Sequence, residues 1–123
     1  MSEEKIIVIP QEELLDAIVQ MDEYAKTSYN TLLSTTSEPL NMEDYSDVNS
    51  LVATLCEFYV GTLRTKEVLL DLIGKEVDSK GAQVPENSIV VADEDYVLAT
   101  SLMTGLLLIE RQLLAQNVSL KQH

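Results

Sequence analysis

The segment Tyr96-Val-Leu-Ala-Thr-Ser-Leu-Met-Thr-Gly-Leu-Leu-Leu-Ile109 carries no charged residue, although the 123-residue chain has a formal net charge of −13. Asp95 precedes this uncharged run and Glu110 follows it, so the run is shorter than the roughly 20 apolar residues that a membrane-spanning helix needs. We therefore expect a helix that is buried in protein and not in a membrane.

The side of this helix opposite its apolar face carries small or weakly polar residues. A helix that faces water normally carries Lys and Glu on its outer side, so both sides should be covered. Because two other helices cannot easily cover both, we expect a homo-oligomer, most simply a dimer. Its predicted interface consists of Ser101, Thr104, Gly105 and Leu108. The alternative is that Gly105 meets Gly61 within one chain.

Apolar residues spaced three and four apart predict two more helices, so that the three span about residues 11–34, 47–79 and 93–117. Gly81 is a plausible end for the second helix, although Gly74 could end it earlier. The short β-type runs 5–9 and 88–92 could pair as a minor two-stranded ribbon. The predicted fold is all-α, an up-down-up bundle of three long helices with this ribbon at one end.

We expect residues 1–123 to form a single helical domain with flexible ends at 1–4 and 118–123. The first residues do not resemble a signal peptide, so the predicted location is the cytoplasm. The single cysteine, Cys56, cannot form an internal disulfide, and its apolar neighbours predict a buried thiol.

Several functional classes lack the residues that they need. The eight basic residues are scattered along the chain, which argues against direct binding to nucleic acid or to an anionic membrane. The only histidine is His123, at the end of the chain, so one chain cannot build a histidine-based triad or a histidine-rich metal site. The four glycines are too far apart to form a phosphate loop. We expect no catalytic residues, no cofactor and no metal.

Acidic residues are the abundant functional group, and they concentrate in the first half of the chain. Residues 1–58 hold twelve acids against two basic residues, whereas residues 59–123 hold nine against six. The predicted partner-binding acidic face consists of Glu12, Glu13, Asp16, Glu23, Glu43 and Asp44. A face that serves only solubility explains the same pattern.

Two charged residues interrupt the apolar stripes of the second and third helices. If these helices form a hairpin that turns at about residue 86, position 66 faces position 106, and Lys66 can reach Glu110. Burying either ion alone costs several kcal/mol, which predicts a buried ion pair. The alternative is that both side chains extend to the edge of the core.

The composition favours a non-catalytic acidic interaction protein, of the inhibitor, adaptor or chaperone type, that binds a basic protein surface as a homo-oligomer. Such proteins recur among phage-encoded and accessory proteins, which is an analogy of composition alone. Two alternatives stay open: an oligomeric protein that sequesters nucleotides or other small ligands, and a carboxylate-based, Mg-dependent nucleotide hydrolase.

Overall fold

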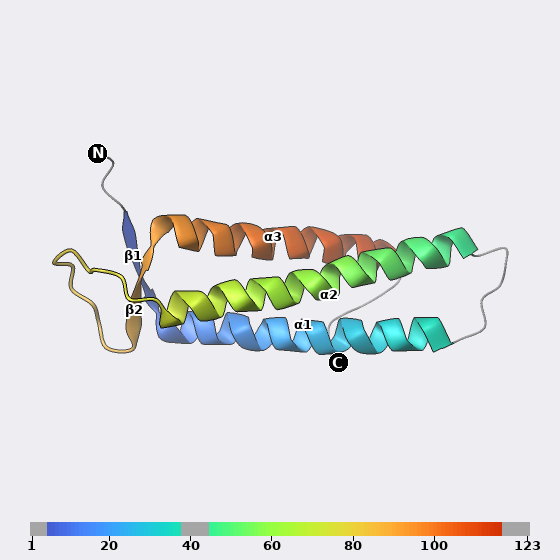
Figure 1. Ribbon diagram of the computed structural model, residues 1–123, viewed down its shortest axis with the longest axis horizontal. Helices are drawn as coiled ribbons and strands as arrows, with labels where there is room; N and C mark the ends of the chain where they lie inside the picture. Colours follow the sequence, from blue (N-terminus) through green and yellow to red (C-terminus); the bar gives the residue numbers. More distant parts are fainter. Residues whose placement is uncertain (1–4, 38–44, 117–123) are drawn as a thin grey trace.

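Two short strands connect directly to two of the three helices in the computed structural model, which describes residues 5–37 and 45–116 (Figure 1). The elements in chain order are β1 (Ile6–Pro10), α1 (Gln11–Ser37), α2 (Tyr45–Gly74), β2 (Ser88–Ala92) and α3 (Asp93–Ala115). The described chain is mainly helical with a small two-stranded antiparallel sheet, which confirms that part of the predicted fold.

The two strands pair in antiparallel register, with Ile6 opposite Ala92 and Pro10 opposite Ser88. Side chains on a strand alternate between its two faces, and the inner face of this ribbon buries Ile9 and Val91 against the ends of the helices. The main-chain pairing continues into the helices, because the N–H of Gln11 donates to the carbonyl of Asn87 at 2.7 Å and the N–H of Asp93 donates to Lys5 at 2.9 Å. The ribbon therefore ties the start of α1 to the start of α3.

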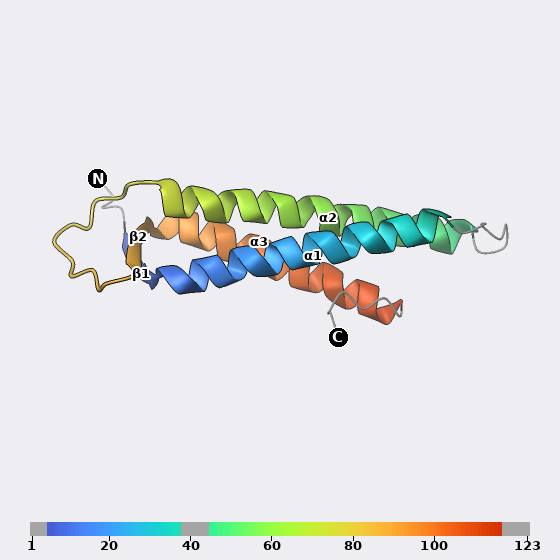
Figure 2. The same ribbon diagram turned by 90° about the horizontal axis from the view of Figure 1, so that it is seen from below.

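The helices alternate in direction along the long axis of the molecule. In Figure 1, α1 and α3 begin beside the ribbon and run away from it, whereas α2 runs back toward it. α2 lies along α1 and also contacts α3, and Figure 2 shows the end of α3 diverging from the other two helices. α2 is therefore the central helix, which holds α1 and α3 on different sides.

The core lies where the stripes of the three helices meet. Its buried members from the helices are Leu14, Ile18, Met21 and Tyr24 of α1, Leu55, Phe58, Leu69 and Leu72 of α2, and Ala99, Leu106 and Leu113 of α3. α2 and α3 approach closely at Gly61, where an added Cβ would lie 2.7 Å from Cδ2 of Leu106. A Cβ at Gly105 would have no neighbour within 4 Å, so the alternative contact between Gly105 and Gly61 is wrong.

Two details of the second helix differ from the prediction. α2 ends at Gly74 and not near residue 79, and the chain turns after it through Lys80 and Gly81, which have positive φ angles of 52° and 81°. Cys56 is exposed, so the prediction of a buried thiol is wrong. Its neighbours Leu55 and Phe58 take the inward side of α2, which leaves position 56 facing outward.

Candidate functional site

The predicted acidic face lies on the outer side of α1. Glu12, Glu13, Asp16 and Glu23 are all exposed, because the inward side of α1 is occupied by the apolar residues of the core. Within the described residues, none of these four carboxylates forms an ion pair with a basic side chain. Glu43 and Asp44, the other two predicted members, lie outside the described residues.

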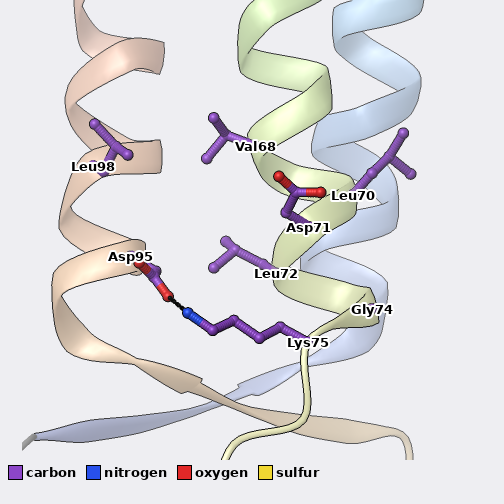
Figure 3. A pocket seen from close by; sticks show the side chains of 8 residues that line it. All are labelled: Val68, Leu70, Asp71, Leu72, Gly74, Lys75, Asp95 and Leu98. Carbon is purple, nitrogen blue, oxygen red and sulfur yellow. Dashed lines mark hydrogen bonds and ion pairs between the residues drawn. The ribbon is translucent and has the colours of Figure 1, made fainter.

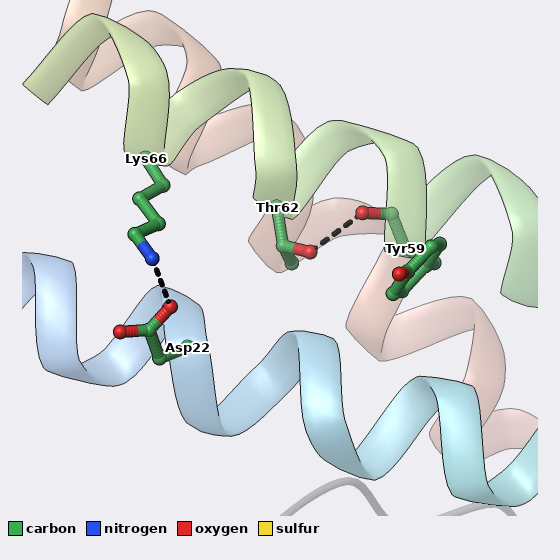
Figure 4. A network of polar contacts seen from close by, with 4 residues as sticks. All are labelled: Asp22, Tyr59, Thr62 and Lys66. Atoms are coloured by element: carbon green, nitrogen blue, oxygen red, sulfur yellow. Dashed lines mark hydrogen bonds and ion pairs between the residues drawn. The ribbon is translucent and has the colours of Figure 1, made fainter.

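The predicted ion pair between Lys66 and Glu110 is wrong. The Nζ atom of Lys66 lies 2.6 Å from Oδ1 of Asp22 on α1, as Figure 4 shows. The prediction placed position 66 opposite position 106, but it is Gly61 that lies against Leu106. This register differs by five residues, more than one helical turn, so Lys66 is carried away from Glu110 and faces α1.

Glu110 is nevertheless buried, with 6% of its surface exposed. A hydrogen bond links its side chain to the Tyr24 hydroxyl, which also accepts a hydrogen bond of 3.2 Å from Nε2 of Gln20. In the described part of the chain, Oε2 of Glu110 has no hydrogen-bond partner. Glu110 thus brings a carboxyl group into the core with only part of its hydrogen-bonding capacity used.

Tyr24 connects this polar contact to the aromatic part of the core. Its ring packs edge-on against Phe58, with ring centroids 5.4 Å apart and planes at 74°. Burial raises the pKa of the Tyr24 hydroxyl, and the hydrogen bond to Glu110 raises the pKa further, because deprotonation would place a phenolate beside the acidic side chain. Tyr24 was not among the predicted site residues, although its step of three from Met21 continues the apolar stripe of α1.

A cavity of about 520 Å³ opens between the end of α2 and the start of α3 (Figure 3). Val68, Leu72 and Leu98 form apolar walls, and an ion pair lies beside them, in which Nζ of Lys75 is 3.1 Å from Oδ2 of Asp95. This ion pair joins the residue that follows α2 to the first turn of α3. Lys75 begins the loop that returns the chain from α2 to β2, and the periodic pattern of the helices gives no signal for its ion pair with Asp95.

A smaller cavity of about 290 Å³ lies among all three helices and combines acidic with apolar lining residues. Glu13 and Asp16 of α1 line it together with apolar side chains that include Leu69 of α2 and Met103 of α3. Across residues 5–37 and 45–116, no group of three or more His, Cys, Asp or Glu residues is placed to hold a metal ion. Glu13 and Asp16 therefore belong both to the acidic face of α1 and to the lining of this cavity.

The outer side of α3 is exposed in the single chain. Of the predicted interface residues, Ser101, Thr104 and Leu108 are exposed and Gly105 is half-buried. Val97 and Leu108 leave 52% and 56% of their surfaces uncovered. Ser101, Thr104 and Leu108 therefore lie on a surface of α3 that the rest of the described chain does not cover, and Gly105 lies at its half-buried edge.

Within the described residues, α3 is the single helix that is long and apolar enough to cross a membrane. Its most apolar 18-residue window has a mean hydropathy of 1.4, and 22% of that window is buried. Length and composition alone do not separate a membrane helix from one that another protein surface covers.

A scan against protein-family models, a search of curated proteins and a search of solved structures find no match to this chain.

Proposed function

We propose that the chain is a non-catalytic interaction protein of the cytoplasm, an up-down-up three-helix bundle that binds a basic protein partner as a homo-oligomer. The observation that carries the proposal is the acidic face of α1, where Glu12, Glu13, Asp16 and Glu23 are exposed and make no ion pair within the described residues. Four unpaired carboxylates within twelve residues of a chain with net charge −13 create a negative potential that attracts cationic groups.

The negative charge of this face determines which kind of partner it can bind. Nucleic-acid backbones and anionic lipid headgroups are themselves negative and would be repelled by it. A basic protein surface brings opposite charges within a Debye length, about 8 Å at physiological salt, where surface charges still attract strongly. Such complementary charges increase the association rate and select the partner.

Charge reversal of the acidic face should abolish partner binding. A variant with Glu12, Glu13, Asp16 and Glu23 all changed to Lys should lose a basic partner that the native chain captures from its host lysate at low salt. The captured partner should also dissociate as the salt concentration rises to a few tenths molar, where the Debye length falls below about 6 Å. Quantitative mass spectrometry of the captured proteins measures both effects.

The matched control reverses four exposed acids elsewhere on the described surface, Glu57, Glu67, Glu76 and Glu86, none of which lies on α3. This control changes the net charge by the same amount, so it separates a specific acidic face from the overall charge. If the α1 variant folds, as judged by circular dichroism, and still captures every basic partner, the acidic face serves only solubility and the proposal is wrong.

The homo-oligomeric part of the proposal is supported by the exposed outer side of α3. α3 has 23 residues, so a contact between two copies along its length, about 35 Å, would bury roughly 1,000 Å² in total, near the lower limit for a specific interface. The proposed interface centres on Ser101, Thr104, Gly105 and Leu108, where small side chains allow two helices to approach closely. The negative charge of the chain disfavours an anionic membrane as the cover.

Leu108→Glu and Gly105→Arg should each dissociate the oligomer, because each places a charge within a contact that would exclude water. Light scattering at micromolar concentration measures the mass of the species in solution. Val60→Glu is the control, since Val60 is 61% exposed on α2 and is not part of the proposed interface on α3. A native chain that scatters as a 13.7 kDa monomer would contradict the assembly.

A further inference from the structure

The exposed side of α3 contains a line of residues spaced alternately three and four apart. Its members are Glu94, Val97, Ser101, Thr104, Leu108 and Arg111, which we call the outer line of α3. All six are exposed, so the line faces away from α1 and α2 along most of the helix. This alternating spacing is the repeat by which one helix packs along another in a coiled coil.

The two ends of the outer line carry opposite charges, and the residues between them match in character from one end to the other. Glu94 begins it and Arg111 ends it, apolar Val97 and Leu108 come next to the ends, and Ser101 and Thr104 occupy the centre. In each of these three pairs, the two residues lie equally far along the helix from the midpoint between Ser101 and Thr104. A second copy of the line, turned by 180° about an axis through its centre, therefore places each residue opposite its counterpart.

We propose that two copies of the chain pair through the outer line of α3 in antiparallel orientation, with Glu94 of each copy opposite Arg111 of the other. This inference rests on the proposed homo-oligomer and specifies its orientation and register. The arrangement forms two intermolecular ion pairs and two apolar contacts between Val97 and Leu108, and it places Ser101 against Thr104. Each residue of one copy therefore meets a residue of matching character on the other.

Charge selects this orientation over the parallel one. In a parallel pair, Glu94 would face Glu94 and Arg111 would face Arg111, so two attractive contacts would become two repulsive ones. No basic side chain forms an ion pair with Glu94 within the described residues, and Arg111 is likewise unpaired there, so both are available to a second copy.

A charge exchange tests the register. Glu94→Arg should weaken self-association at least about tenfold, because it replaces two ion pairs with two like-charge contacts, and Arg111→Glu should do the same. The double variant Glu94→Arg with Arg111→Glu restores opposite charges and should return the dissociation constant to within about threefold of the native value. Glu57→Arg is the matched control, since Glu57 is exposed on α2. Sedimentation equilibrium measures the dissociation constant.

Cysteine crosslinking tests the orientation independently, with the native thiol removed by Cys56→Ser. In the antiparallel pair, a mixture of Val97→Cys and Leu108→Cys chains should crosslink with each other, whereas each variant alone should not, because identical positions lie roughly 16 Å apart. Crosslinking of Val97→Cys alone would instead show a parallel pair and overturn the inference.

The outcomes separate this inference from the proposed function. A dimer whose double charge exchange fails to recover association would keep the homo-oligomer and refute this register. A monomeric native chain would refute both the oligomer and the register, whereas the binding of a basic partner is decided by the charge-reversal experiment on α1.

Discussion

Replacing Phe58 with alanine should lower the free energy of unfolding by about 4 kcal/mol. Phe58 is completely buried in the middle of α2, where its ring meets the edge of Tyr24 on α1. Removing the ring loses its burial free energy and leaves a cavity between the two helices that share the longest contact in the fold. The chain has no other phenylalanine and no tryptophan that could fill this space.

Chemical denaturation followed by circular dichroism measures the change, at one fixed protein concentration because self-association would add to the apparent stability. Phe58→Leu should cost less than Phe58→Ala, because leucine fills part of the space. Val60→Ala, two residues away but 61% exposed, should change the free energy of unfolding by no more than about 0.5 kcal/mol. Equal effects of Phe58→Ala and Val60→Ala would show that α2 is rotated relative to this structure.

Local sequence patterns were sufficient to predict the elements of the fold. The spacing of Leu14, Ile18 and Met21 marks the inward side of α1, and all three are buried. The β-type runs were placed to within one residue, because β-branched residues bounded by turn-forming residues are a local signal. The end of α2 was predicted less well, since Gly74 and Gly81 are both suitable stops and only the loop conformation distinguishes them.

The contacts between helices could not be predicted in the same way, because they depend on how far one helix is shifted along another. The predicted partner of Lys66 was on α3, but the five-residue difference in register, together with the rotation of α2, places Lys66 beside Asp22 of α1. The periodic pattern of one helix contains no information about this shift.

The features of the candidate site also fall into two groups: those that the pattern of one helix predicts and those that depend on how the helices pack. The exposed acids of α1 follow from the amphipathic pattern, which places polar residues opposite the core. The exposure of Ser101 and Thr104 also follows from that pattern on α3, whereas Leu108 is apolar and only the structure shows that it is exposed. The two cavities do not, since each is formed by side chains from at least two helices whose relative positions come only from the structure.

Replacing Tyr24 with phenylalanine should lower the free energy of unfolding by about 2 kcal/mol, although it removes a single oxygen atom. The ring can keep its contact with Phe58, but Glu110 loses its hydrogen bond from the tyrosine hydroxyl and stays buried with Oε2 already lacking a partner. Glu110→Leu in the Tyr24→Phe background should recover most of the loss, because both polar groups are then absent and the core stays filled. The measurement is a double-mutant cycle: thermal or chemical denaturation gives the free energy of unfolding of the native chain, the two single variants and the double variant.

The pH dependence gives this prediction a second measurement. The folded state raises the pKa of Tyr24 above its ordinary value of 10.0, through burial and through the hydrogen bond to Glu110, so the folded chain holds the phenolic proton more tightly than the unfolded chain does. This contribution to stability is complete below about pH 10 and is lost as the pH rises through the raised folded pKa. The stability difference between the native chain and Tyr24→Phe should therefore shrink above about pH 10, while lysine titration, common to both chains, cancels. A difference that stays constant from about pH 8 to about pH 11 would show that neither burial nor Glu110 raises the pKa of the Tyr24 hydroxyl in the folded chain.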